Sequence, residues 1–281
     1  MITFRLLSSP LNSQQRSRLA FLYAVPIATL GGLMGLGGAE FRLPVLVGVL
    51  SYSVRQAIPL NLVISLVTII TSLLIRWHSL SFDSVRPFFP AIVTLILGAV
   101  ISAFYGVTLA RRLSNQQLGQ TILGLLVVIG MALIIEGCLP QQFPALLPHS
   151  LTWWLPAGIL FGLVIGLVSS LLGVAGGEVI IPTLIFAFGA DIKTAGSAAL
   201  WVSLPTVVVG IVRYAHHGAF PDRQAMQETV IPMGVGSVLG AIVGGLLVGL
   251  VPAWLLKIVL GIILNISAIK VFRHHKERRI S

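Results

Sequence analysis

Long stretches without a charged residue dominate the chain. They run over 19–39, 56–75, 87–110, 113–135, 137–177, 194–212 and 229–256. A helix needs about 20 apolar residues to cross the hydrocarbon layer, and most of these stretches reach that length. The pattern predicts an all-α integral membrane protein with about eight membrane segments, over about 19–50, 56–76, 87–109, 115–136, 153–188, 194–212, 229–250 and 252–272.

Composition agrees with this class of protein. Of the 281 residues, 56% are hydrophobic and 9% are charged, and the mean hydropathy is +1.00. A soluble domain carries about 25% charged residues. The lipid bilayer is therefore the expected partner of most of the surface.

The formal net charge of +10 comes from Lys and Arg in the tails and short loops. No continuous basic face with interleaved aromatic residues is present, so nucleic acid is not an expected partner. Cytoplasmic loops of membrane proteins carry an excess of Lys and Arg. Both tails are basic, at Arg16 and Arg18 and again at Lys270–Arg279, so both termini are expected on the cytoplasmic side. No small-residue cleavage site follows the first apolar run, so no removable signal peptide is expected.

The sequence gives no indication of an enzyme. Cys138 is the only cysteine, which excludes an internal disulfide and a thiol-pair redox site. The histidines show no metal-ligand spacing, and no phosphate-binding loop of the Walker type is present. We therefore expect no catalytic residue, no metal and no cofactor.

The chain contains an internal repeat. Placing residue n beside residue n+138 aligns 35–78 with 173–216 without a gap, and eleven of the 44 columns are identical. The identical columns include glycine, glutamate, proline and histidine, which two unrelated membrane helices would not share by hydrophobicity alone. After a shift of four residues the similarity resumes, with 90–99 over 232–241.

The repeat defines the expected organisation. An N-terminal cytoplasmic arm (1–18) precedes repeat 1 (19–138), and a proline-containing linker (139–150) leads to repeat 2 (151–273) and a basic cytoplasmic tail (274–281). Small residues four apart predict surfaces where membrane helices approach closely. They are Thr94, Gly98, Ser102 and Gly106; Gly158, Gly162 and Gly166; and Gly236, Gly240 and Gly244.

The first segment of each half is too long and too rich in glycine for a simple span. As one helix, residues 19–50 would measure about 48 Å, against about 30 Å of hydrocarbon. The glycines predict a break at 35–39, with a helix restarting near residue 39 or 40 and Pro44 in its first turn. The second copy predicts a break at 173–177. Broken helices at membrane depth line a protected cavity, and the restarted helix directs free N–H groups toward an anion.

Two such breaks, one in each half, indicate the binding site of a transporter built from repeats. The stretches GGLMGLGGAEFRLP (31–44) and GLVSSLLGVAGGEVIIP (166–182) resemble the sulfite exporter TauE/SafE family of bacterial permeases, and the resemblance covers roughly 20–272. It implies about eight membrane segments and secondary transport of a small anion, such as sulfite or another organosulfur or organic acid, across the cytoplasmic membrane. An anion channel and, less favoured, a membrane-embedded enzyme of sulfur metabolism are the alternatives.

The candidate substrate-binding residues lie at the breaks and on the helices that follow them. They are Gly35, Gly37, Gly38, Glu40, Gly173, Gly176, Gly177, Glu178, Asn61, Ser65 and Ser203. Asn61, Ser65 and Thr68, with Ser203 and Thr206, recur at near-helical spacing, so they either bond helix to helix or line a cavity.

Glu40 and Glu178 have three possible roles. A carboxylate inside a span needs a partner or a purpose, because burying it is costly. Each side chain could cap its restarted helix, carry a proton for coupled transport or contact the substrate. Arg42 could pair with Glu40, whereas Ile180 takes its place beside Glu178. On that basis Glu178 is the better candidate for proton coupling.

Two membrane topologies fit the pattern. If each broken segment crosses the bilayer, the chain makes eight crossings; if each enters and returns, it makes six crossings and the halves are inverted. The count of Lys and Arg on each side does not decide between them. The absence of both residues from 137–151, which the inverted arrangement places outside, favours inverted repeats.

Overall fold

A computed structural model describes residues 12–79, 84–138, 145–148 and 150–247, and positions 252, 254, 255, 258, 261, 262, 265 and 266. Within these ranges the chain forms helices and connecting turns and no strand, which confirms the all-α class. The linker positions 139–144 and 149, the tail 274–281, residues 1–11 of the arm and most of the predicted segment 252–272 lie outside the described residues.

In the first half, the predicted segment 19–50 is divided into two helices. The helices of this half are α1 (Ser13–Met34), α2 (Ala39–Gly48), α3 (Val54–Ser79), α4 (Phe89–Arg112) and α5 (Asn115–Cys138). Helix α1 begins inside the segment expected to be the arm, because residues 13–18 are already helical.

The second half repeats this order. Its helices are α6 (Leu151–Leu172), α7 (Gly177–Pro182), α8 (Ile192–His216), α9 (Arg223–Ala225) and α10 (Ile231–Leu246). A π-helical turn, Thr183–Ala187, continues α7, and another, Met226–Val230, joins α9 to α10. The predicted segment 153–188 is therefore divided in the same way as 19–50.

Six helices of the described chain are long and apolar enough to cross a membrane, namely α1, α3, α4, α6, α8 and the continuous stretch from α9 to α10. Their outward side chains are bulky and apolar. Leu74, Leu160 and Leu246 are 64%, 62% and 72% exposed, which suits contact with lipid rather than water. The protein is a multi-pass membrane protein.

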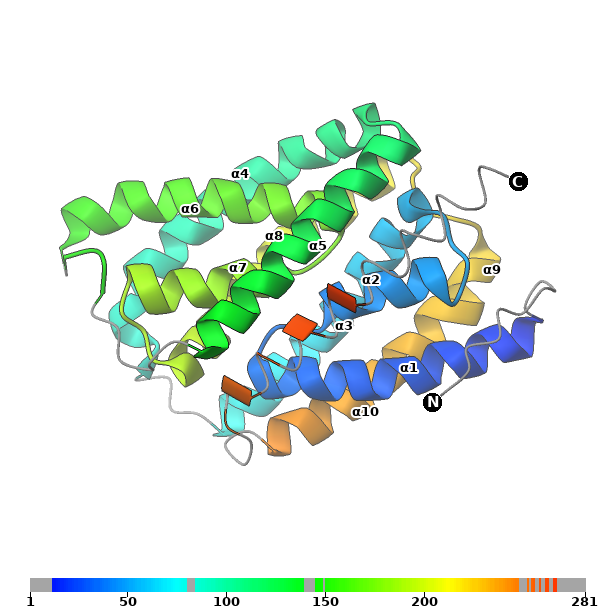
Figure 1. The fold of residues 1–281 in the computed structure, drawn as a ribbon, viewed down its shortest axis with the longest axis horizontal. Helices are drawn as coiled ribbons and strands as arrows, with labels where there is room; N and C mark the ends of the chain where they lie inside the picture. The colour runs from blue at the N-terminus through cyan, green and yellow to red at the C-terminus, as the bar shows by residue number, and fades with distance from the viewer. Residues whose placement is uncertain are drawn as a thin grey trace.

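The most extensive helix contacts join the two halves. Helix α1 packs along α10, and α6 packs along α4 (Figure 1). The small residues lie at these contacts, as predicted: a Cβ on Gly240 would strike the carbonyl oxygen of Val25, and one on Gly162 would strike that of Leu95. The absence of side chains lets the backbones meet.

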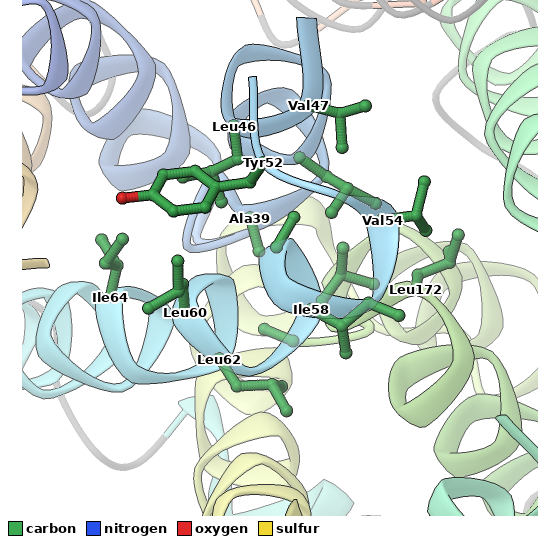
Figure 2. Packing of buried hydrophobic residues seen from close by; sticks show 14 of the residues in the cluster. Ala39, Leu46, Val47, Tyr52, Val54, Ile58, Leu60, Leu62, Ile64 and Leu172 are labelled. Carbon is green, nitrogen blue, oxygen red and sulfur yellow. The ribbon is translucent and has the colours of Figure 1, made fainter. Parts of the chain in front are cut away.

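In each of these two contacts, the first helix of one half, α1 or α6, packs along a later helix of the other half, α10 or α4. The 138-residue shift relates α1 to α6, and the 142-residue shift relates α4 to α10. The contacts are therefore exchanged between the halves. Apolar side chains of α2, α3 and α6 pack together in one buried cluster, in which Leu172 lies beside Ile58 and Val54 (Figure 2).

The start of α8 is fixed by Asp191, which precedes the membrane-crossing part of the helix. Its carboxylate accepts hydrogen bonds from the backbone N–H groups of Lys193 and Thr194 and from the Thr194 hydroxyl. Partial burial raises the pKa of Asp191, but these hydrogen bonds outweigh it and hold the pKa below its usual value.

Asp191→Ala is expected to lower the free energy of unfolding by about 1 kcal/mol, as the loss of an N-cap does. Because the folded-state pKa is depressed, this contribution is present above the unfolded pKa of about 3.9 and is lost as the pH falls through the folded value. Thermal unfolding in detergent at pH 7 and pH 3 measures both effects. An equal difference between wild type and variant at the two pH values would contradict this account.

Candidate functional site

Both predicted breaks are present, at 35–38 and 173–176. Their glycines take left-handed backbone angles, with φ of +79° at Gly35, +68° at Gly38, +63° at Gly173 and +81° at Gly176. Only glycine adopts this region without a steric penalty. Gly37, with φ of +82°, completes the first turn. The new helices begin at Ala39 and Gly177, so the prediction of a restart near residue 39 is confirmed.

At each break the chain folds back on the helix it has just left. A Cβ on Gly38 would lie 2.8 Å from the carbonyl oxygen of Ile27, which is eleven residues earlier. In the second half, a Cβ on Gly176 would lie 3.2 Å from Cγ2 of Ile165, again eleven residues earlier. A continuing helix would separate such residues by about 16 Å. The breaks are therefore reversals.

The two reversals contact each other. A Cβ on Gly37 would lie 3.8 Å from the Cβ of Ala175, which is its equivalent in the second half. A Cβ on Gly177 would lie 3.1 Å from Cα of Leu36. The two breaks therefore pack directly against each other.

The surrounding contacts come in equivalent pairs. A Cβ on Gly35 would lie 2.5 Å from the carbonyl oxygen of Gly196, and one on Gly173 would lie 2.8 Å from that of Ile58. Residue 35 is equivalent to 173, and residue 58 to 196. In each half, the first glycine of the break therefore packs against the backbone at the equivalent position of the other half.

Glu40 and Glu178 meet at this junction. Each is the second residue of its restarted helix, and they are 0% and 3% exposed. Their carboxyl groups lie within hydrogen-bonding reach of each other. Neither carboxyl accepts a hydrogen bond from another side chain or from the backbone of the rest of the described chain. The N-cap residues are Gly38 and Gly176, which have no side chain to cap with, and the capping role of Glu40 and Glu178 stays a prediction.

Arg42 does not form the expected ion pair with Glu40. Its guanidinium is fully buried and donates instead to the Gly37 carbonyl (2.6 Å) and to the hydroxyls of Thr68 (2.9 Å), Ser65 (3.2 Å) and Ser237 (3.1 Å). Residues two apart on a helix point in different directions, which explains the difference. The expectation that Glu178 is the better candidate for proton coupling stays a prediction.

Asn61 joins the two halves at the breaks. Its amide donates to the carbonyl oxygens of Ala39 and Gly173, each at 2.8 Å. Ser65 and Thr68, one and two turns further along α3, accept from Arg42 as described. Of the polar positions predicted on α3, all three therefore serve the breaks.

The polar positions on α8 do not join this network. Ser203 is 1% exposed, and the hydroxyl of Thr206 donates to the Val202 carbonyl of its own helix. Asn61, the residue that bridges the breaks, has Ala199 as its equivalent here. The site is therefore polar mainly on the α3 side.

Two residues that the sequence did not single out close the ends of the broken helices. Arg76 donates to the carbonyls of Gly32 and Leu33 at the end of α1. Its equivalent, Tyr214, donates to the carbonyl of Ser170, which is the equivalent of Gly32. The repeat pairs Arg76 with Tyr214, but these two residue types differ, so residue type alone did not reveal the shared role.

The prediction for Pro44 was wrong. It is the sixth residue of α2, not part of the first turn, and Pro182 is the sixth residue of α7. A proline here removes a donor inside a helix. In the second half the helix widens to a π-helical turn directly after Pro182.

Asn61→Leu is expected to destabilise the protein by about 1–3 kcal/mol, because the buried Gly173 carbonyl loses its donor and is left unsatisfied. Thr206→Val is the matched control, since that buried hydroxyl bonds only within its own helix. Thermal unfolding in detergent compares the two. Equal shifts in unfolding temperature would show that Asn61 does not hold the breaks together.

The family whose model matches this chain is described as Sulfite exporter TauE/SafE, and the match covers residues 20–271. The chain belongs to the TauE/SafE family. Among curated proteins and among solved structures, no significant match was found. The TauE/SafE match includes both breaks and every residue of the site described above.

Membership of the TauE/SafE family gives the general function. It is a family of membrane transporters of the sulfite and anion exporter type, so the substrate class is a small anion and the surroundings are a lipid bilayer. The six candidate spans agree with a multi-pass transporter.

Proposed function

We propose that this TauE/SafE protein is a secondary transporter that moves sulfite or a related organosulfur or organic acid across the bacterial cytoplasmic membrane, coupled to proton movement. The binding site is placed where the two breaks meet, between Gly35–Glu40 and Gly173–Glu178. The observation that carries the proposal is the contact between the buried carboxyl groups of Glu40 and Glu178.

Two carboxyl groups in contact act as one protonation site. If both carboxyl groups were ionised in this buried site, they would repel each other strongly. A proton shared between them removes this repulsion. No other side chain of the described chain donates a hydrogen bond to either group. The carboxyl pair of Glu40 and Glu178 can therefore hold one proton and release it when the site opens to water.

The reversals support the inverted topology. If α1 with α2, and α6 with α7, each enter and leave the membrane on one side, α1 and α6 are not crossings although they are long enough to cross. Each half then makes three crossings: α3, α4 and α5 in the first, and α8, the α9–α10 stretch and the predicted segment 252–272 in the second. An odd number of crossings places the second half upside down relative to the first. The paired contacts at Gly35 and Gly173 fit a twofold axis through the junction of the breaks. Both termini then lie in the cytoplasm, with six crossings in all.

The experiment is flux of radiolabelled sulfite, a sulfonate and a carboxylate in proteoliposomes, with and without an imposed pH gradient. We expect saturable flux of at least one anion that accelerates when the gradient is imposed. Flux that neither saturates nor responds to the gradient would indicate a channel. Chemical conversion of the sulfur compound, measured in the same vesicles, would indicate an enzyme.

A further inference from the structure

Arg42 is a buried cation without a carboxylate partner. It is 0% exposed, and no ion pair of Arg42 occurs within the described ranges. All four groups that accept its hydrogen bonds are neutral. A charge at membrane depth is costly unless it is paired or has a function.

The hydrogen bonds of Arg42 leave donors unused at this site. Ser65 and Thr68 direct their hydroxyl protons to the carbonyls of Asn61 and Ile64, so they serve Arg42 only as acceptors. Nε of Arg42 has no partner. The proton of Ser237 is not committed to another group of the described chain. Two donors are thus available: the charged Nε–H group of Arg42 and the hydroxyl of the neighbouring Ser237.

The second half has no such site. The equivalent of Arg42 is Ile180, and the equivalent of Ser237 is Leu95 under the shift that aligns 90–99 with 232–241. Both are fully buried in the same apolar cluster. At both positions the halves differ in the same way. One side of the junction is therefore polar and the other is apolar.

We propose that Arg42 and Ser237 bind the negatively charged group of the substrate, a single oxyanion per protein. The inference rests on the proposed function, which it deepens by naming the anion site and its stoichiometry. The planar guanidinium suits an oxyanion such as sulfite or a sulfonate, because it offers several N–H donors in a fixed plane.

The buried charges fix the coupling. At the breaks the described chain buries two cations, Arg42 and Arg76, and two carboxyl groups, Glu40 and Glu178. With one proton shared by the carboxyl pair, these four groups carry a net charge of +1, which one monovalent anion on Arg42 neutralises. Without that proton the charge of the anion would be left uncompensated. The anion and the proton therefore bind together and cross in the same direction, one to one.

The test compares two substitutions that keep the positive charge, Arg42→Lys and Arg112→Lys, in proteoliposomes. Lysine preserves the charge but lacks the planar fork. Arg42→Lys is expected to raise the apparent KM for sulfite at least about tenfold. Arg112→Lys is expected to leave it within about twofold, because Arg112 is exposed at the end of α4. Ser237→Ala is expected to raise KM several-fold. Size-exclusion chromatography in detergent checks that each variant is folded.

Stoichiometry provides the second measurement. Binding of radiolabelled sulfite to the purified wild type is expected to saturate at one anion per chain, and a pH-sensitive dye inside the vesicles is expected to record one proton per anion. An unchanged KM in Arg42→Lys and Ser237→Ala, two anions per chain, or protons moving opposite to the anion would overturn the inference. Absence of any wild-type flux would instead overturn the proposed function.

Discussion

Gly35→Ala is expected to abolish transport, whereas Gly218→Ala is expected to leave it close to wild type. Both glycines have left-handed backbone angles, with φ of +79° and +60°. Alanine in that region costs about 1–2 kcal/mol at either position. The two differ in the space around them, since a Cβ on Gly35 would lie 2.5 Å from the carbonyl oxygen of Gly196, and one on Gly218 would have nothing within 4 Å.

The contact at Gly35 cannot relax cheaply, because its neighbour is backbone of the other half. Separating the two breaks would also pull Glu40 away from Glu178. Sulfite flux, normalised to the amount of folded protein in the vesicles, measures the effect. Normal flux in Gly35→Ala would show that close contact between the halves is not needed. A similar loss in Gly218→Ala would show that the backbone angle alone is responsible.

Glu40→Gln and Glu178→Gln are each expected to remove the dependence of flux on the pH gradient. A shared proton requires both carboxyl groups, so loss of either member has the same result. From the sequence, Glu178 was the better candidate for proton coupling; a shared proton makes Glu40 equally necessary. Flux under gradients of both directions, in vesicles of equal protein content, measures the response.

Glu228→Gln is the matched control for the carboxyl pair. Glu228 is also buried, but it lies near the start of α1, where it is 3.7 Å from Arg16 and accepts from Gln224. Its replacement is expected to preserve the response to the gradient. If Glu40→Gln or Glu178→Gln also preserves it, the pair does not carry the proton.

The sequence was sufficient to locate the breaks because several glycines close together in a membrane segment predict a turn rather than a continuous helix. Gly35, Gly38 and Gly173 could be predicted as a turn from residue type and from the repeat alone. The contacts of Gly240 and Gly162 followed in the same way from the spacing of small residues. These features depend on backbone geometry, which the residue type constrains directly.

The partners of the charged side chains could not be predicted in this way. Arg42 is two residues from Glu40 in sequence, yet its partners come from α3 and α10, and Ser237 is 195 residues away. The contact between Glu40 and Glu178 depends on both reversals together. A repeat shows which positions are equivalent, but it does not show which of them meet across the halves.

The exchange of helices between the halves has a consequence for how the protein is made. Helix α1 leaves the ribosome before the helix it packs along, α10, which follows roughly 200 residues later. At about 5–20 residues per second, α1 spends about 10–40 s in the bilayer before that partner is synthesised. During this time the carbonyl groups of Val25 and Thr29, which later meet Gly240 and Gly244, face lipid or another membrane protein. Neither half completes its own packing during translation, so assembly is finished only when the last helices have been inserted.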